Sequence, residues 1–211
     1  MYELVNELEF LFSEMNYSLI RQKIESIDKS LPEYNCLLSK QIIGWYTYMA
    51  HFNLRINDYS SLKLKELFEY TTNLPLEFVE GEHYSKYEIR IIYSYALYCC
   101  SIGDAHVSKR IISKLISYIN EYCYDRDLLI LTRLYHKYAH MLMDNQRFKE
   151  ALEMINLGQG LIVNKSNLLL LSDFIYSKGT CYEHMGFDKK SLKLYARALS
   201  LRNTIGNETY T

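Results

Sequence analysis

Proline is nearly absent from this chain, which has only two, Pro32 and Pro75, among 211 residues. Glycine is scarce as well, with eight residues. Because these two residue types most often interrupt regular structure, their scarcity favours long helices over many short strands and turns. Hydrophobic residues make up 49% of the chain, which is enough to form a core. We therefore expect an all-α protein.

An excess of positive charge is also missing, since 24 Lys and Arg stand against 25 Asp and Glu. A protein that binds nucleic acid normally carries a clear basic excess, so we expect no direct nucleic-acid binding by this chain. The longest aliphatic run, Leu168 to Leu171, is far shorter than the roughly 20 residues that span a bilayer. The N-terminus has no positively charged signal-peptide segment. We expect no membrane association and a cytoplasmic location.

Sequence patterns of enzymes and metal sites are missing too. No glycine-rich phosphate loop, nucleophile elbow or catalytic triad is present, so we expect no enzyme and no cofactor. His136 and His140 lie i, i+4 on a helix face, but His184 is the sole candidate for a third ligand, and we predict no metal site. The five cysteines include no C-x-x-C spacing, which is typical of reduced, buried thiols.

What the chain does have is a helical hairpin repeated about every 40 residues. Small residues recur where two helices must touch, as at Ala96, Ala139 and Gly179, and Gly103 and Gly186 stand at bends between helices. The apolar spacing predicts five hairpins in one domain over residues 1–211, and loops at 31–35 and 73–84. The predicted helix pairs are 2–14 with 18–28, 37–55 with 60–72, 85–101 with 105–122, 126–143 with 148–161, and 167–185 with 188–202.

The last two hairpins resemble tetratricopeptide repeats, with Gly179, Tyr182, Gly186, Tyr195 and Ala198 at the small and aromatic positions. This resemblance implies a right-handed superhelix of about five hairpins with a concave binding surface.

A narrower resemblance involves the stretch 42–48, repeats longer than 34 residues and the ending 198–207. In these features the chain resembles the C-terminal regulatory domain of Gram-positive peptide-pheromone regulators of the Rgg and PlcR type. In that family the repeats follow a helix-turn-helix domain, which we do not find here, and bind a short signalling peptide on the concave face. The family uses groove asparagines to hold the peptide, whereas the matching positions here contain none.

In such repeats the first helix of each hairpin faces the concave side. The expected ligand-binding positions mix hydrogen-bonding groups with apolar side chains, which suits an extended peptide. Equally, they are what any solvated face of an amphipathic helix would show. The positions are Arg90, Tyr93, Ser94 and Leu97 in the third hairpin, Arg133, His136, Lys137 and His140 in the fourth, and Asp173, Tyr176, Ser177 and Thr180 in the fifth.

The sequence thus predicts a peptide-binding regulatory domain of a bacterial transcriptional regulator. The alternative is a constitutive scaffold that joins two proteins without switching. We expect a homodimer, because the last hairpin lacks a polar capping helix and carries Leu192, Leu194, Leu199 and Leu201.

Overall fold

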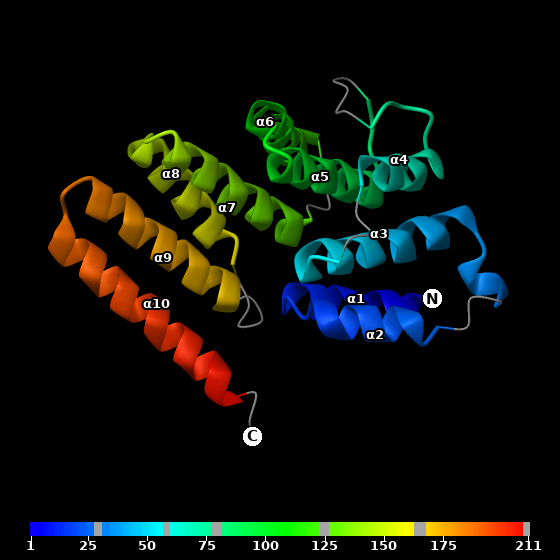
Figure 1. The fold of residues 1–211 in the computed structure, drawn as a ribbon, viewed down its shortest axis with the longest axis horizontal. Helices are drawn as coiled ribbons and strands as arrows, with labels where there is room; N and C mark the ends of the chain where they lie inside the picture. The colour runs from blue at the N-terminus through cyan, green and yellow to red at the C-terminus, as the bar shows by residue number, and fades with distance from the viewer. Residues whose placement is uncertain (28–30, 57–59, 77–81, 123–126, 163–167, 209–211) are drawn as a thin grey trace. The chain divides into compact units, whose positions relative to one another are not determined.

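The structure, a computed structural model, is all-helical wherever it describes the chain (Figure 1). It describes residues 1–27, 31–56, 60–76, 82–122, 127–162 and 168–208, which form ten α-helices and one 3₁₀-helix and include no strand. The prediction of an all-α fold is confirmed. The chain divides into two compact units, residues 1–115 and 116–211. That these make up a single domain over 1–211 stays a prediction.

The helices match the predicted ones closely, although the second and fourth end at Glu25 and Glu69, before the predicted ends at 28 and 72. The predicted loop at 31–35 contains a 3₁₀-helix, and the last helix continues past the expected end at 202. The predicted turn at 57–58 lies outside the described residues. The elements are α1 (Tyr2–Ser13), α2 (Tyr17–Glu25), η1 (Pro32–Tyr34), α3 (Leu37–Leu54), α4 (Ser61–Glu69), α5 (Lys86–Ser101), α6 (Ala105–Tyr122), α7 (Leu128–Asp144), α8 (Phe148–Gly160), α9 (Leu168–His184) and α10 (Asp188–Glu208).

Each of the five hairpins bends at one residue with positive φ. These residues are Met15 (56°), Arg55 (55°), Gly103 (92°), Gln146 (59°) and Gly186 (80°). The left-handed region reverses the chain direction after a helix and favours glycine, which lacks a Cβ. Only two bends have glycine, so the other three were found from the apolar periodicity and not from a breaker residue.

Side chains fix several helix starts by accepting hydrogen bonds from unpaired backbone N–H groups. Asn16 accepts from Leu19, and Asp127 accepts from Ile130. Ser85 and Glu88 form a reciprocal capping box at the start of α5. These caps are local sequence signals for three helix starts, whereas Met1 and Arg147 provide no side-chain cap for α1 and α8.

The core of the first unit is built around Trp45, whose side chain is 0% exposed. Its ring packs against Phe12 and Tyr46, with centroids 5.0 and 4.8 Å away. The indole N–H donates to the Arg90 carbonyl (3.0 Å) and to Ser94 Oγ (2.9 Å). The only tryptophan therefore joins α3 to α5 inside the unit, as a core residue.

A buried ion pair completes this core. The Arg90 guanidinium is 1% exposed, lies 4.9 Å from the Trp45 ring centroid and donates to Glu9 (2.9 Å) and to the Tyr46 hydroxyl (3.0 Å). Burial acts to raise the pKa of Glu9, but Arg90 and Lys86 outweigh it and lower that pKa below its usual value. Glu9 is therefore ionised at neutral pH and fastens α1 to α5.

In the second unit the small residues have the packing role that the repeat pattern predicted. A Cβ built on Gly158 of α8 would lie 2.3 Å from Cζ of Phe174, which is fully buried on α9. A Cβ on Gly179 of α9 would lie 2.7 Å from the Tyr195 ring of α10. Both glycines thus permit a close approach of neighbouring helices.

Replacing Gly158 with alanine is expected to destabilise the protein by about 2 kcal/mol, because the added methyl overlaps a buried ring that has no room to move. Gly160 is the matched control, since it lies on the same helix and a Cβ there has no neighbour within 4 Å. Gly160→Ala should be neutral or slightly stabilising. Urea unfolding of both variants makes the comparison, and equal midpoints would contradict the close packing.

The cysteines differ in part from the prediction. The four described cysteines are free, and Cys99 and Cys181 are buried as expected. Cys36, however, is exposed at the start of α3, where its sulfur accepts a hydrogen bond from the Ser39 N–H (3.4 Å). Its position as a helix cap places it at the surface and not in the core.

Candidate functional site

The α5 positions predicted to bind ligand lie mostly inside the first unit. Arg90 and Ser94 are 1% and 0% exposed and have partners on α1 and α3, which corrects the expectation that they lie on an open face. The reason is that α1 and α3 cover this side of α5. Tyr93 is also buried, at 4% exposure, and Leu97 is half-buried.

In the second unit, by contrast, the structure brings three predicted residues from α7 and α9 together. His136 Nε2 and His140 Nε2 are 3.2 Å apart, and Ser177 Oγ lies 3.2 Å from His140 Nε2. The His136 ring also packs edge-on against Phe174 of α9, with centroids 5.0 Å apart. The cluster is therefore held by both hydrogen bonds and an aromatic contact.

Both histidines are neutral at physiological pH. Burial, and after it the neighbouring His140 and Arg133, lowers the pKa of His136 to about 3. Burial likewise lowers the pKa of His140. In neutral imidazoles one nitrogen donates and the other accepts, so one Nε2 donates to its neighbour according to the tautomers present. The cluster can thus both donate and accept hydrogen bonds while its histidines stay uncharged.

The remaining predicted residues of α9 are held by α10. Asp173 forms an ion pair with Arg202. The Tyr195 hydroxyl donates to Thr180 Oγ1 at 3.2 Å, and the Tyr195 ring lies 5.0 Å from the ring of Tyr176. Tyr176 itself is 57% exposed, a high value for an aromatic side chain. It therefore offers apolar area for a ligand at the surface of α9.

The two cationic residues among the predicted ligand-binding positions of α7 differ in exposure. Arg133 is 9% exposed and Lys137 is half-buried, so Lys137 is the more accessible cation on α7. Sequence reasoning missed the contribution of Arg202 on α10, which pairs with Asp173. The spacing of charges within one helix gave no signal for this pair, because the partners come from different helices.

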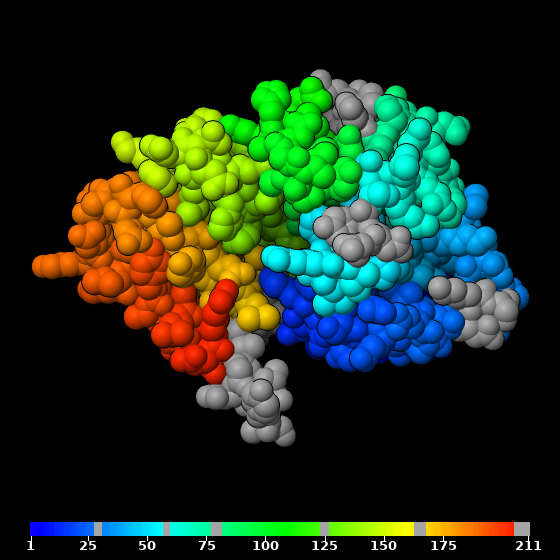
Figure 2. Space-filling model, viewed as in Figure 1, coloured from blue at the N-terminus to red at the C-terminus, as the bar shows by residue number. Residues whose placement is uncertain are grey.

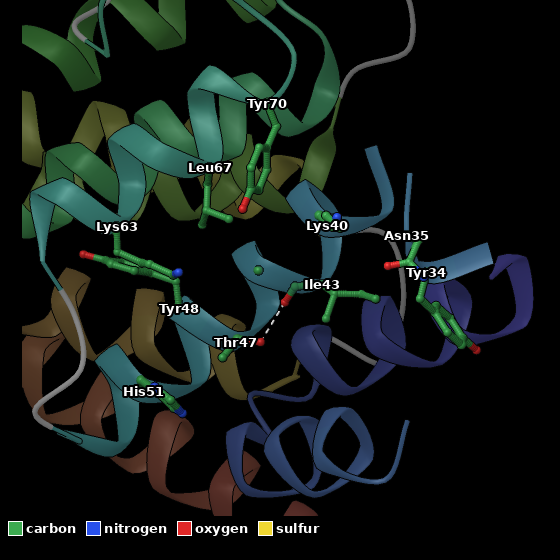
Figure 3. Close-up of a pocket in the computed structure, with 11 residues that line it drawn as sticks. Tyr34, Asn35, Lys40, Ile43, Thr47, Tyr48, His51, Lys63, Leu67 and Tyr70 are labelled. Atoms are coloured by element: carbon green, nitrogen blue, oxygen red, sulfur yellow. Dashed lines mark hydrogen bonds between the residues drawn. The ribbon is translucent and has the colours of Figure 1, made fainter. Parts of the chain in front are cut away.

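A second feature, which the sequence did not predict, is a pocket of about 290 Å³ in the first unit. Figure 3 shows residues of η1, α3 and α4 around it. The lining residues are Tyr34, Asn35, Lys40, Ile43, Gly44, Thr47, Tyr48, His51, Lys63, Leu67 and Tyr70.

The described residues include neither a metal site nor a membrane-spanning helix. No group of three or more His, Cys, Asp or Glu side chains in the described part of the chain is placed to hold a metal ion. His184, the candidate third ligand, stacks on Phe148 with ring centroids 4.7 Å apart. Within the same ranges, no helix has the length and apolar character required to cross a membrane.

Stacked helical hairpins with small residues at the helix contacts define a tetratricopeptide-like repeat domain. The family model of the RNPP family C-terminal domain matches residues 5–211. The chain therefore belongs to the RNPP family, as its C-terminal domain, and the predicted resemblance to Rgg- and PlcR-type regulators is confirmed.

A solved structure agrees with this fold. The crystal structure of Bacillus thuringiensis PlcR in complex with the peptide PapR7 and DNA matches with a TM-score of 0.77 at 16% identity, covering 99% of this chain and 71% of that chain. Two structures of the Podosopora anserina putative kinesin light chain with TPR-like repeats match with TM-scores of 0.49 and 0.47, at 13% and 12% identity. They cover 97% and 96% of this chain, and 94% and 93% of their own. No curated protein matches the chain in sequence.

Proposed function

We propose that this chain is the regulatory domain of a transcriptional regulator and that it senses a short peptide. The observation that carries the proposal is the match of the RNPP C-terminal domain over residues 5–211. The PlcR structure, which contains a peptide and DNA, supports it through the shared fold. The role is regulatory and not catalytic, and it is exercised in the cytoplasm.

The peptide contacts α7 and α9 of the second unit. An extended peptide needs hydrogen-bonding partners for its backbone and apolar contacts for its side chains. The neutral pair His136 and His140, with Ser177, supplies the former, and exposed Tyr176 supplies the latter. Lys137 adds a cation for a peptide carboxylate. Of the remaining positions, Arg133, Asp173 and Thr180 border this face, whereas Tyr93 and Leu97 lie in the first unit and stay sequence predictions.

Binding acts by shifting the population of two arrangements of the domain. A ligand changes such an equilibrium only if it contacts the two arrangements differently. The hydrogen bonds that Tyr195 and Arg202 of α10 donate to Thr180 and Asp173 of α9 give a direct route for this difference. A peptide that moves α9 also changes the position of α10.

A homodimer formed through α10 would carry this change to a second chain. Leu192 and Leu199 of α10 are 67% and 61% exposed, and much of α10 lies open on the face shown in Figure 2. Exposed leucines on one helix are typical of a surface that a partner covers. In this proposal the chain itself contacts no nucleic acid, in keeping with its net charge of −1.

Native mass spectrometry of the protein purified from its host tests both points at once. We expect the mass of two chains with a short peptide bound, and the released peptide can be sequenced. Tyr176→Ala should weaken the peptide affinity about 5- to 30-fold, since an exposed aromatic at a peptide site contributes on the order of 1–2 kcal/mol.

Leu157→Ala is the matched control, because Leu157 is similarly exposed, at 50%, but lies on α8. It should retain the peptide. A bare chain, or one that carries a folded protein, would contradict peptide sensing and favour the scaffold alternative. The mass of a single chain with a peptide bound would contradict the homodimer but leave peptide sensing supported.

A further inference from the structure

We propose that the pocket between η1, α3 and α4 binds a small organic carboxylate with an apolar body, at a site separate from the peptide face (Figure 3). Its volume of about 290 Å³ is near the lower end of the range for ligand pockets, which suits a molecule smaller than a peptide. The proposal does not depend on the proposed function.

The floor of the pocket is apolar. Ile43, Tyr48 and Leu67 line it and are 8%, 2% and 2% exposed. Gly44 brings the two helices close, because a Cβ there would lie 2.2 Å from Leu67 Cδ2. The absence of a side chain at Gly44 therefore lets α4 lie against the backbone of α3 beside the hollow. Such a floor favours an aromatic or aliphatic group.

The rim of the pocket is positively charged. Lys40 on α3 and Lys63 on α4 are exposed at its edge, and none of the described lining residues is acidic. Glu66, outside the lining, pairs with Lys63 at 3.0 Å and accepts from the Tyr70 hydroxyl at 3.1 Å. Glu66 thus offsets one of the two cations, and the rim keeps an excess positive charge from Lys40.

Polar groups of the lining add hydrogen-bonding capacity next to these cations. Thr47 Oγ1 donates to the Ile43 carbonyl at 2.8 Å, an internal bond that fixes its rotamer (Figure 3). Tyr34 ends η1 and Asn35 follows it, on the other side of the pocket from α4. An apolar floor beneath a cationic, hydrogen-bonding rim is complementary to an apolar body with a carboxylate head.

The predicted peptide positions on α5 have equivalents on α3, since both are the first helix of a hairpin. The pocket lies on a different face of α3 from these equivalent positions. Aligned at the bends Arg55 and Gly103, Tyr93 of α5 corresponds to Trp45 of α3, which is buried in the core. Ile43 precedes Trp45 by two positions and is turned from it by about 200° around the helix. A ligand in the pocket therefore does not use the positions assigned to the peptide.

The test is a ligand-observed NMR titration of the full chain with three probes of nearly equal shape. These are 3-phenylpropionate, its neutral amide and 3-phenylpropylamine. We expect the carboxylate to bind at least about fivefold more tightly than the amide, and the amine to bind most weakly, because the head group changes from anionic to neutral to cationic beside a positively charged rim. Equal affinities for the three probes would overturn the proposal.

Three variants locate the binding. Lys40→Ala should lower the carboxylate affinity about fivefold and leave the amide affinity unchanged. Lys65→Ala is the matched control, because Lys65 lies on α4, is exposed and pairs with Glu69 as Lys63 pairs with Glu66, but does not line the pocket. It should leave all affinities unchanged. Thr47→Trp should fill the pocket and abolish binding of the carboxylate.

If Thr47→Trp retains a helical circular dichroism spectrum and still binds the carboxylate, the site lies elsewhere and the proposal is wrong. If that variant does not fold, Lys40→Ala decides alone. An equal loss with Lys40→Ala and Lys65→Ala would show a general charge effect and would also contradict a specific site.

Discussion

Replacing Arg90 with alanine is expected to lower the free energy of unfolding by about 2–4 kcal/mol, somewhat less than the cost of leaving a fully buried charge unpaired, because Glu9 is partly exposed. The guanidinium is 1% exposed and contacts Glu9, the Tyr46 hydroxyl and the Trp45 ring. Without Arg90, the Glu9 carboxylate, which is 24% exposed, keeps only the more exposed Lys86 as an ion-pair partner among the described residues. The substitution also opens a cavity beside the indole of Trp45. Urea unfolding followed by circular dichroism measures the change.

Lys86→Ala is the matched control, since Lys86 pairs with the same carboxylate at 2.9 Å but is 49% exposed. An exposed pair contributes only about 0–1 kcal/mol, so this variant should unfold almost like the parent. Similar midpoints for the two variants would mean that Arg90 does not stabilise the first unit. In that case Arg90 would again be a candidate for ligand binding.

The second large effect is a loss of stability as the pH falls below about 6.5. The pKa of His136 is about 3 in the folded protein against 6.5 for an ordinary histidine, because burial disfavours its charged form. Below pH 6.5 the unfolded chain therefore takes up a proton that the folded chain does not. Stability falls with pH down to about pH 3 and is independent of this group above pH 6.5.

At about 1.4 kcal/mol for each pH unit, His136 alone should remove about 3 kcal/mol between pH 7.5 and pH 4.5. His140, whose pKa is also lowered, should steepen the loss. The measurement is the urea midpoint as a function of pH. His136→Gln should show a flatter dependence, even if its stability at pH 7.5 is lower than that of the parent.

His184→Gln serves as the control from the same unit, because His184 is exposed on α9. It should keep the steep dependence of the parent protein. A parent midpoint that does not change between pH 7.5 and pH 4.5 would contradict the neutral, buried His136. The same would follow if His136→Gln and the parent had parallel curves.

The fold was predictable to a large extent because its signals are local. Apolar residues at helical spacing, the caps at Asn16 and Ser85 and the bends at Gly103 and Gly186 all act within a few residues of each other. The continuation of α10 to Glu208 was not predicted, since Gly206 is ordinarily a residue that ends a helix.

The candidate site was predictable only in part. The positions of His136 and His140 on one face follow from i, i+4 spacing, and the structure adds Ser177 from the next hairpin. The pocket at α3 and α4 gave no sequence signal, because Tyr34, Lys40 and Lys63 belong to three separate elements. The apolar periodicity of one helix does not predict which side chains of other elements line a pocket beside that helix.

By itself, then, the sequence determined the helical hairpins, their bends and the family to which the chain belongs, because periodicity and repeated motifs are properties of neighbouring residues. Only the tertiary structure decided what Arg90 does. A lone arginine on a helix is read from the sequence as a surface cation, since burying an unpaired charge is costly. Packing of α1 against α5 supplies Glu9, from a distant part of the chain, and turns that cation into a core residue.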